Sequence, residues 1–509
     1  MDAAVNCEDI ITSEDRLELI VVRDEAREPI KEPICKRPVN ERYEIWYYDR
    51  RDMPPLSMTQ YGYSAIPNCY GLLDSTSLEV SGILRLQNQP TLSLKGQGVF
   101  IAIPDTGVGA EDTNGHGSFM ASVACGKPDP QNDFTGAAPE AELIAIKLQE
   151  APKVLRDFYY IPENVPVYAE SEIMLAVAQA KAIAAKANRP LVTCIGLGSS
   201  SGTHTGTNPL CEYLDSIAAE RQQAVVVATG NEANASRHYY GQTQSMLTPD
   251  RVEINVENDM AGFTLELATL APEIVTVAVQ SPTGEIVPRG HIPAGANQTY
   301  EFLFEGTTLS IDYQNVGRAR RDILIFFRFS NVKKGIWTIL VYPYNIINGA
   351  FHMWLPMREL QLGNVYFLKS NPYVTLTTPS DARSVISVGG YNAANGAVYL
   401  DSGRGYTMDG NVKPDFLAPA VEVQGKNARG DYVTRTGTSA AAAITAGACA
   451  QILEWAVVRG NDIGINSVEI KNILIRGCDR RSGQEYPSPI NGFGNLNVYN
   501  SFDQMRGKS

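Results

Sequence analysis

The chain has 509 residues, of which 44% are apolar and 19% are charged, and its formal net charge is −13. This length allows two or three domains and a large core. The acidic balance and the lack of any basic run exclude nucleic acid and anionic membrane surfaces as expected partners. No stretch approaches the roughly 18 uninterrupted apolar residues of a membrane span, so we expect a globular protein without one.

The N-terminus and the cysteines indicate the cellular compartment in which the protein is expected to lie. The first residues, MDAAVNCEDIITSEDRLE, are acidic and lack the apolar region of a secretory signal. The eight cysteines are scattered and none forms a C-x-x-C pair, which is typical of reduced thiols and not of a disulfide frame or a zinc site. We expect an intracellular protein with no metal and no cofactor.

Residues 1–72 form a first, charged segment with the strand-like runs RLELIVV and RYEIWYY. Beyond it, short runs that are apolar on both faces and bounded by glycine predict strands of a covered parallel sheet. These runs are GVFIAIP (98–104), ELIAIKL (142–148), LVTCIGL (191–197), AVVVATG (224–230) and SVISVGG (384–390).

Helical patterns lie between the apolar runs. Residues 171–188 carry apolar side chains at helical spacing, and residues 208–223 add an Asn208 cap and Pro209 in the first turn. Alternation of strands and helices predicts an α/β fold with one mostly parallel sheet and helices on both faces.

One region departs from this alternation of strands and helices. Residues 247–368 show alternating patterns such as RVEINVEN, GFTLELAT and GIWTILVYPY, separated by turn signals. They predict an antiparallel insert, a sandwich or jelly roll. The expected domains are therefore 1–72, 73–246, 247–368 and 369–509.

Candidate chemistry begins with Ser439 in TRTGTSAAAAITAGACA, at the start of a small-residue helix. A serine hydroxyl is a weak nucleophile until a base takes its proton, and that base needs an orienting carboxylate. His116, in NGHGSFMASVACG, is the one histidine of five that directly precedes a helical pattern. It is our candidate base, and Ser439 is our candidate nucleophile.

Asp105 is the candidate carboxylate, because GVFIAIPDTG places it at the end of the first sheet strand, where open α/β sheets carry their reacting groups. Asn231, in VVVATGNEANAS, also follows a strand and offers an amide donor for an oxyanion. Simpler readings remain open: Ser439 as a helix cap, His116 as a structural residue, Asp105 and Asn231 as turn residues. Asp112 is an alternative orienting acid.

The order of DTG, NGHGS, GNE and GTS followed by small residues resembles the subtilisin-like (S8) serine peptidases. CIGLG resembles that family's substrate-pairing strand, with Gly196, Leu197 and Gly198 at its edge, and KPDFLAP (413–419) matches the segment before the serine motif. The resemblance implies a subtilisin-like fold and a serine endopeptidase with Asp105, His116 and Ser439 as its triad. Asn231 would complete the oxyanion hole.

A narrower resemblance links YGYSAIPNCYGLLDST, LRLQNQPTLSLKGQGV, TGAAPEAELIAIKL and the β insert to the clostridial Csp germination proteases. It implies that residues 1–72 are a small α+β prodomain that aids folding and is removed autocatalytically near residue 72. It also implies a protein substrate, the zymogen of a spore cortex-lytic hydrolase, and an enzyme that works inside the spore.

Two departures from the family favour a second reading, a catalytically inactive scaffold that binds partners or signals in germination. Only TGVGAEDTNG (106–115) separates the aspartate from the histidine, so one wall of the cleft is expected to be missing or rebuilt. Pro104 precedes Asp105, and a proline there is expected to re-aim the carboxylate.

Overall fold

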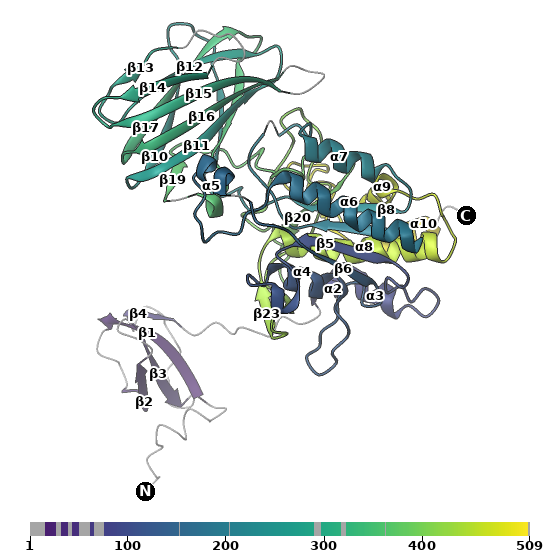
Figure 1. The fold of residues 1–509 in the computed structure, drawn as a ribbon. Coiled ribbons are helices and arrows are strands. Elements are labelled where there is room, and N and C mark those ends of the chain that lie inside the picture. The colour runs from purple at the N-terminus through teal and green to yellow at the C-terminus, as the bar shows by residue number, and fades with distance from the viewer. Residues whose placement is uncertain are drawn as a thin grey trace. The chain divides into compact units, whose positions relative to one another are not determined.

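The computed structural model describes residues 16–26, 32–38, 43–49, 62–65, 76–151, 153–202, 204–289, 297–316, 322–361 and 363–506. The chain divides into two compact units, Met1–Leu72 and Leu73–Ser509. Figure 1 shows both units.

The described part of the first unit is an antiparallel sheet in the order β2-β3-β1-β4. Its strands are β1 (Arg16–Ala26), β2 (Cys35–Pro38), β3 (Tyr43–Asp49) and β4 (Gly62–Ala65). The helical part of the predicted α+β unit lies outside the described residues. Cys35 is disulfide-bonded, so the prediction that every cysteine is a reduced thiol is wrong for this residue.

The second unit is built on a six-stranded sheet in the order β21-β20-β8-β7-β5-β6, and all its strand pairs are parallel. The strands are β5 (Phe100–Asp105), β6 (Glu142–Lys147), β7 (Leu191–Ile195), β8 (Gln223–Ala228), β20 (Ile386–Tyr391) and β21 (Phe416–Pro419). All five strands predicted from doubly apolar runs form. β5, β7, β8 and β20 are almost wholly buried, whereas β6 lies at the edge of the sheet and most of its residues are exposed.

Helices cover the two faces as Figure 1 shows: α6 and α7 lie on one side and α8 on the other. Val225 and Val227 of β8 pack with α6 and α7, while Val226 and Ala228 pack with α4 and α8. Asn208 caps α7 by accepting from the Cys211 N–H. The helices are α2 (Thr76–Val80), α3 (Ile83–Asn88), α4 (His116–Cys125), α5 (Lys153–Tyr159), α6 (Glu170–Ala187), α7 (Pro209–Ala218), α8 (Thr438–Leu453), α9 (Ser467–Gly477) and α10 (Val498–Arg506).

Helix α8 is the core helix of this unit. The alanines from Ala440 to Ala443 are at most 1% exposed, and the helix continues into a π-helical turn, Glu454–Val458. The span Thr438–Val458 has the length and composition of a membrane helix, but 83% of its apolar window is buried in the fold. A helix that is apolar all round belongs inside a large core, and this one lies there.

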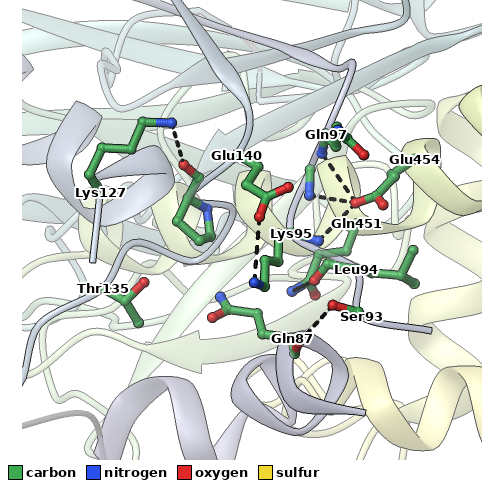
Figure 2. A network of polar contacts seen from close by, with 12 residues as sticks. Gln87, Ser93, Leu94, Lys95, Gln97, Lys127, Thr135, Glu140, Gln451 and Glu454 are labelled. Carbon is green, nitrogen blue, oxygen red and sulfur yellow. Dashed lines mark hydrogen bonds and ion pairs between the residues drawn. The ribbon is translucent and has the colours of Figure 1, made fainter. Parts of the chain in front are cut away.

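The segment before β5 is fixed to the end of α8 (Figure 2). The Glu454 carboxylate accepts hydrogen bonds from the backbone N–H groups of Lys95, Gly96 and Gln97 at 2.8, 2.7 and 3.2 Å. The buried Gln451 amide donates to Leu94 O at 3.1 Å. The chain is therefore hydrogen-bonded firmly into the second unit some twenty residues after the expected prodomain junction.

The insert is an antiparallel sandwich of two sheets, ordered β13-β12-β17-β10-β19 and β14-β15-β16-β11-β18-β9. Its core is rich in aromatic side chains, among them Phe263, Phe329 and Trp337. The strands are β9 (His238–Gln242), β10 (Asp250–Val256), β11 (Met260–Thr269), β12 (Ile274–Gln280), β13 (Ile286–Val287), β14 (Asn297–Phe302), β15 (Thr307–Val316), β16 (Asp322–Val332), β17 (Gly335–Asn345), β18 (Ala350–Trp354) and β19 (Val365–Phe367). β9 precedes the expected start of the insert at residue 247 and forms the edge of one sheet.

Three histidines and a tryptophan stack where the sandwich meets the parallel-sheet domain. The His204 ring, from a loop after β7, lies 4.0 Å from Trp354 between centroids. His238 and His352 stack on the same tryptophan, and His238 Nε2 lies 2.9 Å from His352 Nδ1. Burial lowers the pKa of His352 to about 3 and lowers that of His238 well below 6.5.

These depressed pKa values predict that the fold loses stability in acid. Above pH 6.5 the imidazoles are neutral whether the chain is folded or unfolded. Below it, only the unfolded chain takes up the protons, so unfolding is favoured by roughly 1–2 kcal/mol per histidine between pH 6.5 and 5. Urea unfolding at pH 7 and pH 5 would measure this, and His352→Gln should reduce the difference. An equal loss in both proteins would contradict the assignment to this stack.

Candidate active site

Asp105 and His116 form a direct pair. His116 Nδ1 lies 2.8 Å from Asp105 Oδ1 and 2.9 Å from Oδ2. Asp105 is fully buried, whereas the His116 side chain keeps 22% of its exposure. Burial disfavours the imidazolium, but the charge and hydrogen bond of Asp105 outweigh this and raise the pKa of His116 above 6.5. Pro104 lies within β5 opposite Ile146 and does not turn the carboxylate away, which corrects that expectation.

The short segment 106–115 brings the acid and base together through a compact hydrogen-bonded loop. Asp112 is its centre: its carboxylate accepts from the Thr106 hydroxyl at 2.6 Å and from the Gly115 and Ser118 N–H groups, each at 2.7 Å. Burial opposes its charge, but these hydrogen bonds hold the pKa of Asp112 below its ordinary value. Asp112 therefore holds the backbone on both sides of the histidine, and Asp105 is the acid that faces the ring.

We expect Asp112→Ala to destabilise the catalytic unit by about 2–4 kcal/mol, because three donors around a buried carboxylate lose their acceptor. Urea unfolding in a Ser439→Ala background, which avoids self-digestion, would measure the change. Glu111→Ala is the matched control, since Glu111 is the exposed neighbouring acid. Equal midpoints for the two variants would show that Asp112 does not organise the loop.

Ser439 lies in the first turn of α8, near the imidazole of His116. A Cβ placed on Gly196 would lie 3.2 Å from His116 Cε1 and 3.2 Å from Ser439 Cβ. His116 Cε1 and Ser439 Cβ are therefore separated by no more than twice 3.2 Å. The pairing of Nδ1 with Asp105 leaves Nε2 as the nitrogen free to act as base. A hydroxyl, an imidazole and a carboxylate thus meet at the carboxyl edge of the sheet.

Asn231 lies beside the same serine. A Cβ on Gly437 would lie 3.5 Å from Ser439 Oγ and 3.6 Å from Asn231 Nδ2. Asn231 Oδ1 accepts from the Thr438 backbone N–H at 3.0 Å, which turns the amide so that its NH₂ is the group left to donate. Thr438 has no sequence signal for this orienting role beyond its place beside Ser439.

The segment after β7 carries Gly196, Leu197 and Gly198. Its continuation pairs with another loop, because Ser199 N donates to Thr378 O at 3.0 Å and Thr378 N donates to Ser199 O at 2.8 Å. Gly196, at the start of this segment, lies next to His116 and Ser439.

Comparison with known proteins agrees with this arrangement. The profile of the Subtilase family (peptidase S8) matches residues 102–308 and 362–494, which is more than half of the chain. The chain belongs to the subtilase family. The subtilisin-like α/β fold and the family of serine peptidases predicted from the motifs are thus confirmed.

The subtilase has similar relatives of known structure or sequence. The CspB protease of Clostridium perfringens has a TM-score of 0.76 at 24% identity, covering 85% of this chain and 98% of that one. The serine protease AprX of Bacillus subtilis (strain 168) is 31% identical over 147 residues, 25% of this chain and 31% of AprX. The C5a peptidase of Streptococcus pyogenes serotype M1 is 22% identical over 357 residues, 65% of this chain and 28% of that protein. The subtilase spans less than a third of these two curated relatives.

Proposed function

We propose that this subtilase is an active serine endopeptidase in which Ser439, His116 and Asp105 form the catalytic triad. The observation that carries the proposal is the pair of 2.8 and 2.9 Å contacts between His116 Nδ1 and the buried Asp105 carboxylate. They form although the connecting segment is short, and this supports an active triad over an inactive scaffold.

The reaction would proceed by acyl transfer. His116 Nε2 takes the proton of Ser439 Oγ as the oxygen attacks the peptide carbonyl, and Asp105 fixes the tautomer and stabilises the imidazolium. Asn231 Nδ2 and the Ser439 N–H donate to the oxyanion. The imidazolium then protonates the leaving amine. Water, deprotonated by His116, hydrolyses the acyl-enzyme and frees the serine.

We further propose that the protein is made as a precursor, is cut by its own active site near residue 72, and activates a cortex-lytic zymogen during spore germination inside the spore. The support is the motif resemblance to the Csp group together with the fold shared with CspB. The anchoring of Lys95, Gly96 and Gln97 by Glu454 leaves the catalytic unit intact after such a cut.

A fluorophosphonate probe tests the catalytic proposal directly. We expect stoichiometric labelling of the purified protein, with the adduct mapped to Ser439 by peptide mass spectrometry. Absence of labelling together with a full-length mass would identify an inactive binding scaffold instead. Labelling with no cleavage of a purified cortex-hydrolase precursor would retain the peptidase and refute that substrate.

A further inference from the structure

Thr377 lies between the two loops that lead away from β7 and β8. Its N–H donates to Thr229 O at 3.0 Å, and the next residue, Thr378, exchanges two backbone hydrogen bonds with Ser199. Ser199 follows β7 and Thr229 follows β8, and these strands are neighbours in the sheet. Both loops therefore hold the backbone at Thr377.

The Thr377 side chain fills the space between two glycines. A Cβ on Gly198 would lie 2.8 Å from Thr377 Cβ, and a Cβ on Gly230 would lie 2.6 Å from Thr377 Oγ1. Thr377 is 1% exposed. The room left by the two missing side chains is thus taken up by a third side chain.

The bound peptide would place a side chain in this direction. Its attacked carbonyl must reach Ser439 Oγ and Asn231 Nδ2, and Asn231 directly follows Gly230. Because Gly196 lies beside Ser439, the peptide backbone would run along residues 196–198. The side chain of the residue that supplies the carbonyl, P1, then projects between Gly198 and Gly230, toward Thr377.

We propose that Thr377 is a specificity-determining residue that closes the P1 pocket and restricts cleavage to small P1 residues such as glycine, alanine and serine. The inference rests on the proposed peptidase activity and adds the class of substrate. Because Thr377 fills the space between Gly198 and Gly230, a leucine or phenylalanine side chain at P1 would overlap it.

The threonine cannot move aside easily, because its neighbours are fixed. His204 Nδ1 lies 2.9 Å from Leu376 O, and the His204 ring stacks on Trp354 of the sandwich at 4.0 Å. The Ser380 hydroxyl donates to Thr377 O at 2.6 Å. A packed floor of this kind resists the shift that a larger side chain would demand.

The test compares peptides that differ only at P1. We expect kcat/KM for alanine to exceed that for phenylalanine by at least about 100-fold, since one misfit methylene changes kcat/KM by roughly 10–200-fold. Thr377→Gly should raise the phenylalanine-to-alanine ratio at least about tenfold. Because both substrates are measured on one enzyme, a general loss of activity does not alter this ratio.

Thr377→Val is the matched control, because valine keeps the volume and removes the hydroxyl; it should keep the alanine preference. If the wild type cleaved peptides with phenylalanine or leucine at P1 as fast as those with alanine, the inference would be overturned but the proposed peptidase activity would be retained. An unchanged ratio in Thr377→Gly would have the same consequence. No cleavage of any peptide and no fluorophosphonate adduct would overturn the peptidase, and the inference with it.

Discussion

Ser439→Ala is expected to accumulate as the full 509-residue chain and to lose peptidase activity by about 10⁴–10⁶-fold. The hydroxyl beside His116 is the atom that would form the acyl-enzyme, and when it is missing only the oxyanion donors and binding contacts remain to assist hydrolysis. Intact mass of the purified protein reports processing, and a fluorogenic peptide reports turnover.

Thr434→Ala is the matched control for this variant. It removes a hydroxyl from the same TRTGTS stretch, but Thr434 is exposed and lies in strand β23 (Tyr432–Arg435). It should be processed and active like the wild type. If Ser439→Ala were cut near residue 72 as efficiently as this control, a different protease would be responsible for the cut.

Asp105→Asn is the second large effect, with an expected fall in kcat of about 10⁴-fold and little change in stability. The Thr106 N–H already donates to Asp105 Oδ1 at 2.8 Å, so an asparagine would keep its oxygen there. Its NH₂ would then face His116 Nδ1 and force the proton onto Nε2. An imidazole in that tautomer cannot take the proton of Ser439.

The pH profile separates this tautomer effect from misfolding. In the wild type, burial of His116 is outweighed by Asp105, so activity should rise through a pKa above 6.5 as the imidazole loses its proton. Asp105→Asn removes that charge, and the acid limb of its residual activity should move to lower pH. An unchanged limb would mean that another acid faces the ring.

Much of the fold was predictable because its signals are local. Both faces of the parallel sheet are covered, so strands such as β7 and β8 are continuous apolar runs. The Asn208 cap and Pro209 mark the start of α7. The pairing of Asp105 with His116 could be anticipated from the motif order and from the place of Asp105 at the end of a sheet strand.

Other features depend on the path of the chain in space. Asp112 looks like a rival acid in the sequence, and only the loop's hydrogen bonds show that it holds backbone. Nothing in the sequence distinguishes Thr438 and Thr377 from the other threonines. Their roles come from contacts with segments that are distant in the sequence. The interpretation of every cysteine as a free thiol missed the disulfide of Cys35, because spacing alone does not show spatial proximity.

The position of the sandwich in the chain has a consequence for how the molecule folds. Val226 of β8 pairs with Ile386 of β20, about 160 residues later, and the whole sandwich lies between them. β8 and β20 must come together before the sheet can be completed. Pairing of strands so far apart in the sequence slows folding. We expect the rate-limiting event in vitro to be joining of the two sheet halves after the sandwich has formed.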